Sequence, residues 1–300
     1  MEGIRRLADP KISLASMASI FLGASLAAAA GPIHLGWLAA TVIGIFAIEV
    51  AKNASGEIYD WDSGADLAVA PEDRSPFSGG KRVLVDGLLS RRQTWVVAWV
   101  GYGIGIAAGF AIAFFREPDV LWLGVAGVAL AFFYGAPPLR LAYRGLGELA
   151  VALVYGPGIA AGTYLVQRGA IEFEVVAASL PLGILIGAFL WINELPDRRA
   201  DRAVGKRTRV VRLGRPAAAR GFVALLAAAF LLQATLPALG LPAGSLLGLA
   251  GAAPALVAAR VALAAPAETE RIVPAQVATL LAFLLVALGT GIGVLVSGTA

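Results

Sequence analysis

Long apolar stretches recur along the whole of this 300-residue chain. A helix that crosses the hydrocarbon core of a bilayer needs roughly 20 mostly apolar residues. Only 15% of the residues are charged, whereas a soluble domain carries about 25%, so too few charges are present to cover a water-exposed surface. The sequence therefore predicts an all-α membrane protein, a single polytopic domain over 1–300. Nine stretches are predicted transmembrane helices: 12–30, 34–53, 94–115, 119–138, 147–166, 174–194, 217–238, 242–264 and 274–297.

The basic residues predict how these helices are oriented, because cytoplasmic loops are enriched in Lys and Arg. If the N-terminus is cytoplasmic, all 24 Lys and Arg residues except Arg116 and Arg168 fall on or beside the cytoplasmic side. We therefore expect a multi-pass protein of the cell inner membrane, with the N-terminus and two long loops, 54–93 and 195–216, in the cytoplasm. This orientation accounts for the net charge of +4, so no nucleic acid is expected as a partner.

Cysteine and histidine counts exclude several kinds of site, and the residues that flank the first apolar stretch leave one alternative for it. The chain has no cysteine and one histidine, His34, which excludes disulfides, thiolate sites and metal centres built from several histidines. The first apolar stretch follows Arg5, Arg6 and Lys11 and ends in small residues. These flanks are also typical of a cleaved signal peptide, which is the alternative to a retained first helix.

The second long loop begins with a cluster of acidic and amide side chains. Asn193, Asp197 and Asp201 are spaced i, i+4, i+8, so on a helix they share one face. Pro196 is expected to distort that turn. Oxygen-bearing side chains at the end of an apolar helix predict a site for a hard cation such as Mg²⁺.

The first long loop begins with a similar cluster. Asn53, Glu57 and Asp60 are spaced i, i+4, i+7 and again share a face. Gly64 is expected to end this helix, so that Asp66 turns back toward the cluster. Glu49 lies one turn earlier and is also expected to reach inward.

Two acidic clusters that face one another would repel unless cations lie between them. A pair of Mg²⁺ ions that hold a diphosphate would satisfy both clusters. Basic side chains would supply the rest of an anion site, because Arg and Lys bind phosphate oxygens. A flexible segment, residues 75–80, is expected to close over the bound molecule. The basic candidates are Arg74, Lys81, Arg140 and Arg144, with Lys206 after the second cluster.

These residues carry a family resemblance over about 12–295. The chain resembles the UbiA superfamily of intramembrane prenyltransferases, and within it most resembles 1,4-dihydroxy-2-naphthoate prenyltransferases of menaquinone synthesis. The resemblance implies nine helices bundled around a central cavity that opens to the cytoplasmic side, with the two Asp-rich motifs after helices two and six. The stretches that carry it are 57–60 with 63–66, 134–140, 143–149 and 197–208.

The resemblance also implies a chemistry for the named residues. Mg²⁺ between the clusters would bind a polyprenyl diphosphate, with Asp60, Asp66, Asp197 and Asp201 as the central catalytic and metal-binding residues. Asn193 would complete the second metal shell. In the family frame the first motif opens with Gly56-Glu57 in place of the usual Asn-Asp, so either Asn53 or Glu57 completes the first shell. An allylic cation would form and react with an aromatic acceptor, shielded by aromatic walls. The candidates for those walls are Phe132, Phe133, Tyr134, Tyr155 and Trp191.

Several alternatives stay open at this point. The acceptor could instead be 4-hydroxybenzoate, homogentisate, a chlorin acid or a glyceryl phosphate. A cation-coupled transporter would use acidic residues as an ion path, but such residues lie near the middle of the membrane, whereas these lie at one face. The sequence therefore favours the prenyltransferase.

Overall fold

The computed structural model describes residues 1–264 and 268–298, and within them every regular element is a helix. The predicted all-α fold is confirmed. The predicted domain 1–300 also includes residues 265–267 and 299–300, which lie outside the described residues. The elements are α1 Glu2–Ala8, α2 Pro10–Ala30, α3 Leu35–Ser63, α4 Ala65–Ala68, η1 Pro71–Asp73, α5 Arg91–Phe115, α6 Val120–Phe133, η2 Leu141–Arg144, α7 Gly147–Leu153, η3 Val154–Gly158, α8 Ile159–Arg168, α9 Phe173–Ala203, α10 Arg209–Leu213, α11 Arg215–Thr235, η4 Leu236–Leu239, η5 Ala243–Gly251, α12 Ala252–Ala264 and α13 Thr269–Ser297.

Eight helices in the described residues are long and apolar enough to cross a membrane. They correspond to eight of the nine predicted stretches. The remaining stretch, 119–138, forms the shorter apolar helix α6, because the chain leaves helical geometry before Pro137 and Pro138. Four of these eight passes are composite. They are made of α1 and α2, of α7, η3 and α8, of α11 and η4, and of η5 and α12.

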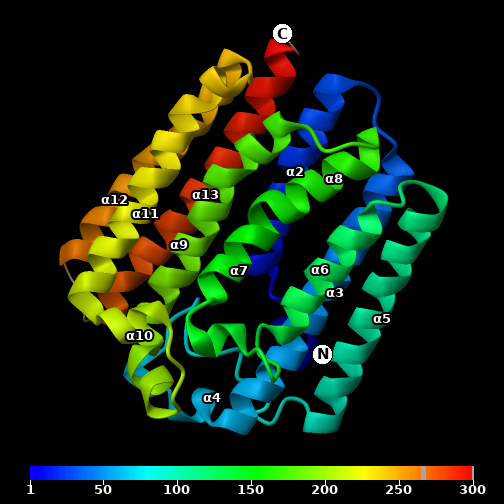
Figure 1. Cartoon of the computed structure of the whole chain (residues 1–300). Helices are drawn as coiled ribbons and strands as arrows, with labels where there is room; N and C mark the ends of the chain where they lie inside the picture. The colour runs from blue at the N-terminus through cyan, green and yellow to red at the C-terminus, as the bar shows by residue number, and fades with distance from the viewer. Residues whose placement is uncertain (265–267, 299–300) are drawn as a thin grey trace.

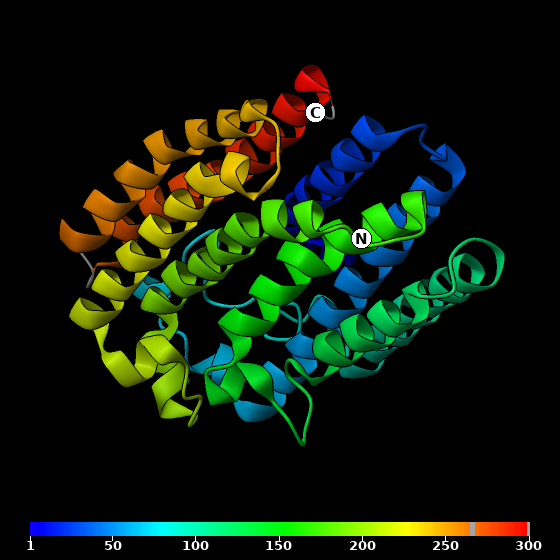
Figure 2. The ribbon, with the colours of Figure 1, turned by 45° about the horizontal axis from the view of Figure 1, so that its top comes forward.

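The helices run side by side in one bundle (Figure 1). In both views α11, α12 and α13 gather on one side and α3, α5 and α6 on the other, with α7, α8 and α9 between them (Figures 1 and 2). The N-terminus, α4 and α10 lie toward one end of the bundle, and the C-terminus lies at the opposite end (Figure 1). The acidic clusters therefore lie at the end that carries the N-terminus.

Two helices extend beyond the predicted transmembrane stretches and carry the acidic clusters. The stretches 34–53 and 174–194 end at residues 53 and 194, whereas α3 continues to Ser63, where Gly64 is expected to end it, and α9 continues to Ala203. Apolar length marks only the part of a helix that lies in lipid, whereas the polar turns that follow are stabilised inside the protein. Gly64 then ends α3 in the left-handed conformation, with φ 80°, as expected for a glycine C-cap. Each acidic cluster is thus carried on the last turns of a rigid helix.

The packing uses small residues where helices approach closely. A Cβ at Gly101 of α5 would lie 2.7 Å from the carbonyl oxygen of Ala47 on α3, and one at Gly105 would lie 2.4 Å from Cδ1 of Ile48. Close backbone approach of this kind stabilises helix pairs in membranes. A larger core joins α2, α9, α11, α12 and α13 around fully buried side chains such as Phe222 and Phe283.

The pass made of α7, η3 and α8 is interrupted in its middle. Gly156 leaves helical geometry (φ −87°, ψ −107°) and is followed by Pro157. A Cβ at Gly156 would lie 2.6 Å from Cα of Gly183 on α9. The absence of side chains at both positions therefore allows the two helices to touch at the break.

Candidate active site

The first acidic cluster is held by contacts with three other segments. Asn53 donates from Nδ2 to the carbonyl oxygen of Leu7 at 2.9 Å, and the N–H of Leu84 donates to Oε1 of Glu57 at 2.8 Å. The Tyr143 hydroxyl donates to Oδ1 of Asp60 at 2.8 Å. These bonds fix the side chains of the last turns of α3 against α1, the loop after η1, and η2.

Asp66 joins this cluster from α4, where the predicted turn at Gly64 places it. Its side chain is buried, and Oδ2 has no hydrogen-bond partner. Burial raises the pKa of Asp66 to about 8, and the neighbouring charges of Asp60 and Glu57 act in the same direction. A carboxyl group of this kind is poised to exchange a proton for a cation.

The second cluster lies on the last turns of α9, which runs through Pro196 without ending. Asn193 and Asp201 are buried, and Oδ1 of Asn193 has no hydrogen-bond partner. The backbone N–H of Gly79 donates to Oδ1 of Asp197 at 2.8 Å.

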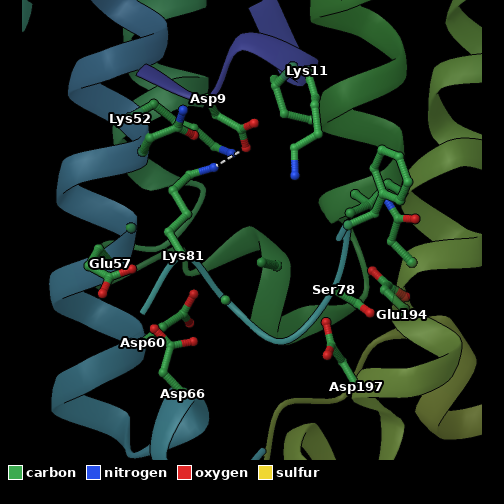
Figure 3. Close-up of a pocket in the computed structure, with 18 of the residues that line it drawn as sticks. Asp9, Lys11, Lys52, Glu57, Asp60, Asp66, Ser78, Lys81, Glu194 and Asp197 are labelled. Carbon is green, nitrogen blue, oxygen red and sulfur yellow. Dashed lines mark hydrogen bonds and ion pairs between the residues drawn. The ribbon is translucent and has the colours of Figure 1, made fainter. Parts of the chain in front are cut away.

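One cavity of about 650 Å³ is lined by both clusters. Figure 3 shows Glu57, Asp60 and Asp66 on one side of it and Glu194 and Asp197 on the other. Among the described residues no group of three or more carboxylates lies close enough to hold a metal ion as it stands. All of the predicted metal ligands nevertheless line this cavity: Asn53, Glu57, Asp60, Asp66, Asn193, Asp197 and Asp201.

Lys206 links the two clusters. Its Nζ lies 3.3 Å from Oδ1 of Asp201 on α9 and 3.9 Å from Oδ1 of Asp60 on α3. Burial by itself lowers the pKa of Lys206, but the two carboxylates outweigh it and raise this pKa well above its usual value. Lys206 therefore carries a positive charge at the point where the clusters meet.

Of the four predicted diphosphate-binding residues, one lines the cavity and three do not. Lys81 lines the cavity and forms an ion pair with Asp9 (Figure 3). Arg74, Arg140 and Arg144 are not among its lining residues in the part of the chain described. Arg140 lies over the ring of Tyr143, at 4.5 Å from its centroid, and Arg144 donates to the carbonyl oxygen of Pro138 at 2.9 Å.

Only some of the aromatic residues predicted to line the cavity do so. Tyr134 and Tyr155 line the cavity. Phe132 instead packs against Trp99 and Tyr102, and Phe133 contacts Phe132. Trp191 is turned toward α11, where its Nε1 donates to the carbonyl oxygen of Ala218 at 2.9 Å.

Several lining residues were not found by sequence reasoning. Lys52, Phe189, Glu194 and Asp9 all line the cavity. Lys52 carried a usable signal, because a lysine inside the apolar stretch 34–53 is costly without a function. Asp9 had no such signal, because only the fold brings the junction of α1 and α2 to this cavity.

A second, apolar groove of about 370 Å³ adjoins the cavity. Lys52, Tyr134, Val151 and Tyr155 line both spaces. The groove then runs between α3, α5, α6 and α8, lined by side chains such as those of Ile112 and Val166. The site is therefore amphipathic, with a polar chamber at the helix ends and an apolar extension within the bundle.

Known proteins share both the sequence pattern and the architecture. The chain is 28% identical to a 1,4-dihydroxy-2-naphthoate octaprenyltransferase of Bacillus subtilis over 225 residues, which cover 75% of this chain and 69% of that protein. It is 27% identical to the protein of the same description from Haemophilus influenzae, over 69% of this chain and 68% of the relative.

Solved structures show the same fold. A UbiA homologue from Aeropyrum pernix K1 superposes with a TM-score of 0.66 at 23% identity, covering 95% of this chain and 97% of the other. A UbiA homologue from Archaeoglobus fulgidus, bound to GPP and Mg²⁺, superposes with a TM-score of 0.63 at 16% identity, covering 98% and 99%. The model of the UbiA prenyltransferase family matches residues 16–273. Because this match covers most of the chain, the protein belongs to the UbiA prenyltransferase family.

Proposed function

We propose that this prenyltransferase moves a polyprenyl group from an allylic diphosphate to an aromatic acceptor of the 1,4-dihydroxy-2-naphthoate type, with Mg²⁺ as its cofactor. The observation that carries the proposal is one cavity lined by acidic clusters from two helices and joined to an apolar groove. A diphosphate head group suits the first space and a polyprenyl tail suits the second. The acceptor class is supported by the relatives from Bacillus subtilis and Haemophilus influenzae, which are described as acting on that compound.

The side chains of the cavity fit Mg²⁺. Oδ2 of Asp66, Oδ1 of Asn193 and Oε2 of Glu194 are buried oxygen atoms without a hydrogen-bond partner, and carboxylate and amide oxygens are suitable ligands for this ion. We propose that Asp60, Asp66, Asn193, Asp197 and Asp201 hold it, with Asn53 or Glu57 completing the first shell. Bound Mg²⁺ would neutralise the charge that develops on the leaving diphosphate. The relative from Archaeoglobus fulgidus is described as binding GPP and Mg²⁺.

Basic residues of the chain would bind the diphosphate. Lys52, Lys81 and Lys206 line the cavity, and their charge would stabilise the leaving group as the C–O bond breaks. Arg74, Arg140 and Arg144 stay predictions for this role. For Lys81 to act, its ion pair with Asp9 must be exchanged for one with phosphate oxygens.

Aromatic and apolar residues would protect the allylic cation. Tyr134, Tyr155 and Phe189 line the cavity, and aromatic faces stabilise nearby positive charge. The loop at residues 75–80, which lines the same cavity, would exclude water from the reacting groups. We also infer that the chain acts as one membrane domain in the cell inner membrane, with the N-terminus and the cavity facing the cytoplasm, because the basic residues gather at that end.

The test is a transfer assay on the purified full-length protein in nanodiscs. Geranylgeranyl diphosphate and Mg²⁺ are supplied with a panel of acceptors that includes dihydroxynaphthoate, 4-hydroxybenzoate, homogentisate and a glyceryl phosphate. We expect a prenylated naphthoate product by mass spectrometry, abolished by EDTA and restored by Mg²⁺. If only another compound is prenylated, that compound replaces dihydroxynaphthoate as the proposed acceptor. If no acceptor is prenylated, the proposal is refuted.

An acidic residue outside the cavity gives a matched control. Asp197→Asn should lower transfer by at least about 10²-fold, since it removes a proposed ligand of the Mg²⁺ that stabilises the leaving diphosphate. Asp62 is exposed and paired with Arg91 at 2.7 Å. Asp62→Asn removes the same charge outside the cavity and should leave transfer close to that of the unaltered protein.

A further inference from the structure

Glu49 is the one carboxylate among the residues that line the apolar groove in the described part of the chain. It lies within the apolar length of α3, and its side chain is only 6% exposed. An acidic side chain at membrane depth is costly to maintain and is usually functional. The metal and diphosphate sites proposed above do not use it.

Two hydroxyl groups hold this carboxylate. The Tyr155 hydroxyl donates to Oε1 of Glu49 at 2.7 Å, and the Ser16 hydroxyl donates to Oε2 at 2.9 Å. The three residues come from three separate membrane passes. Because each carboxylate oxygen accepts one hydrogen bond, Glu49 is fixed in one orientation with Oε1 directed at Tyr155.

Tyr155 stands where the polar chamber meets the apolar groove. It lies in the π-helical segment η3, a kind of interruption that is frequent at functional sites. Its backbone carbonyl oxygen accepts a hydrogen bond from Ser19, and its side chain lines both spaces. A substrate with its diphosphate at the acidic clusters and its tail in the groove would place its reacting carbon beside this phenol.

We propose that Tyr155 and Glu49 form a proton relay that serves a hydroxylated aromatic acceptor. This inference rests on the proposed function. As a ring carbon of the acceptor bonds to the allylic carbon, the C–O bond of the diphosphate breaks and its electron pair leaves with the diphosphate. The acceptor hydroxyl then loses its proton to the Tyr155 oxygen, while Tyr155 passes its own proton to Oε1 of Glu49.

The products of this step are the prenylated ring in its keto form, free diphosphate, intact Tyr155 and protonated Glu49. The ring becomes aromatic again when the substituted carbon loses its hydrogen as a proton, or in a naphthoate its carboxylate as CO₂, and the keto oxygen takes up a proton. The proton on Glu49 returns through the Tyr155 hydroxyl, which lines both spaces, to the diphosphate in the polar chamber, so Glu49 is ready for the next turnover.

The base of the relay, Glu49, is not one of the carboxylates proposed to hold Mg²⁺. A general base must lie within hydrogen-bond reach of the proton that it takes. In the proposed function the acidic clusters hold Mg²⁺, and in the structure they bind Gly79 and Lys206. Glu49 instead lines the groove on the other side of Tyr155. Tyr155 touches the acceptor in this scheme, and Glu49 acts through it.

Two variants test the relay against a matched control. Glu49→Gln and Tyr155→Phe keep the shape of each side chain but remove the proton acceptor or the transmitting hydroxyl. Both should lower the transfer rate by about 10²-fold, the usual contribution of a positioned acid or base. Tyr102→Phe also removes a buried hydroxyl, which lies 3.1 Å from Oγ of Ser55 and lines neither space, and it should keep the unaltered rate.

Two further readouts separate the relay from a structural role. Binding of geranyl thiolodiphosphate with Mg²⁺, measured by calorimetry, should be unchanged in Glu49→Gln. The transfer rate of this variant, divided by that of the unaltered protein, should rise across a series of ring-fluorinated dihydroxynaphthoates with more acidic hydroxyl groups. Intrinsic ring reactivity cancels in this ratio.

Each outcome has a definite meaning. An unaltered protein that transfers to no acceptor refutes the proposed function. An active unaltered protein with a fully active Glu49→Gln variant refutes the relay alone. Equal loss with every acceptor, or loss of thiolodiphosphate binding, assigns Glu49 to packing and also refutes the relay.

Discussion

The backbone N–H of Gly79 donates to Oδ1 of Asp197 at 2.8 Å, although the two residues lie 118 positions apart. The next residue, Gly80, packs against Asp66 of the other cluster. The segment at residues 75–80 therefore contacts both acidic clusters, and Figure 3 shows Ser78 of this segment beside Asp197. Substrate binding and the position of this segment should consequently be coupled.

A substitution at Gly80 tests that coupling. Gly80 has φ 75°, and a Cβ there would lie 2.2 Å from Oδ1 of Asp66. Gly80→Ala should therefore displace the Asp66 carboxylate and weaken Mg²⁺-dependent binding of a diphosphate analogue by about tenfold or more, because a metal ligand is misplaced. Calorimetry with geranyl thiolodiphosphate measures the loss.

Gly87 supplies the control for backbone strain. It lies in the same connection with φ 65°, and a Cβ there would meet nothing within 4 Å. Gly87→Ala carries the same left-handed strain, about 1 kcal/mol, without the collision. Equal loss of binding in the two variants would mean that loop strain, and not the position of Asp66, controls the site.

The pH dependence of cation binding follows from Asp66. Its pKa is raised to about 8, so below pH 8 the carboxyl group is protonated and Mg²⁺ must displace the proton. The affinity for Mg²⁺ should therefore increase with pH, by up to about tenfold per unit between pH 6 and 7, and level off above pH 8. Asp66→Asn should flatten this slope. A pH-independent affinity in the unaltered protein would contradict the role of Asp66.

Lys206 gives a prediction for stability. Its Nζ lies between Asp60 and Asp201, so Lys206→Gln leaves the two clusters without their shared positive charge. Loss of one partner of a fully buried pair commonly costs about 3–5 kcal/mol. The Lys206 side chain is 18% exposed, so a smaller loss is expected, and the melting temperature without Mg²⁺ should fall. Added Mg²⁺ should recover part of that loss, because a bound cation stabilises the folded state.

The same measurement on Lys11→Gln is the control. Lys11 also lines the cavity but is bonded to the carbonyl oxygen of Pro76 and not to a carboxylate. Its replacement should lower the melting temperature little, and Mg²⁺ should not restore what is lost. If Mg²⁺ stabilised the two variants equally, it would not be replacing the positive charge that Lys206 supplies between the clusters, and the prediction would be wrong.

Features that depend on the local sequence pattern, such as the membrane passes and the residues that share a helix face, could be predicted from the sequence. Apolar length located the passes, and the i, i+4 spacing placed Asn193 and Asp197 on one face of α9. The sequence could not reveal that Arg140 turns onto Tyr143 or that Trp191 faces α11, because these directions depend on how helices rotate against one another. The positive-inside rule applies equally to every Lys and Arg of the cytoplasmic loops, so the sequence does not distinguish Lys81, which lines the cavity, from Arg144, which does not.

The contact at the break in the fifth predicted helix yields a last prediction. Gly156 allows η3 to touch Gly183 of α9, where a Cβ would lie 2.6 Å from its Cα. Gly156→Ala should force the helices apart at a cost of about 1–3 kcal/mol and shift Tyr155, so both the melting temperature and the transfer rate should fall. A Cβ at Gly103 of α5 would meet nothing within 4 Å, and this residue lines neither the cavity nor the groove, so Gly103→Ala should lower neither quantity. A tolerant Gly156→Ala variant would mean that close approach of α9 is not what positions Tyr155, and the placement of the phenol would then depend on its hydrogen bonds with Glu49 and Ser19.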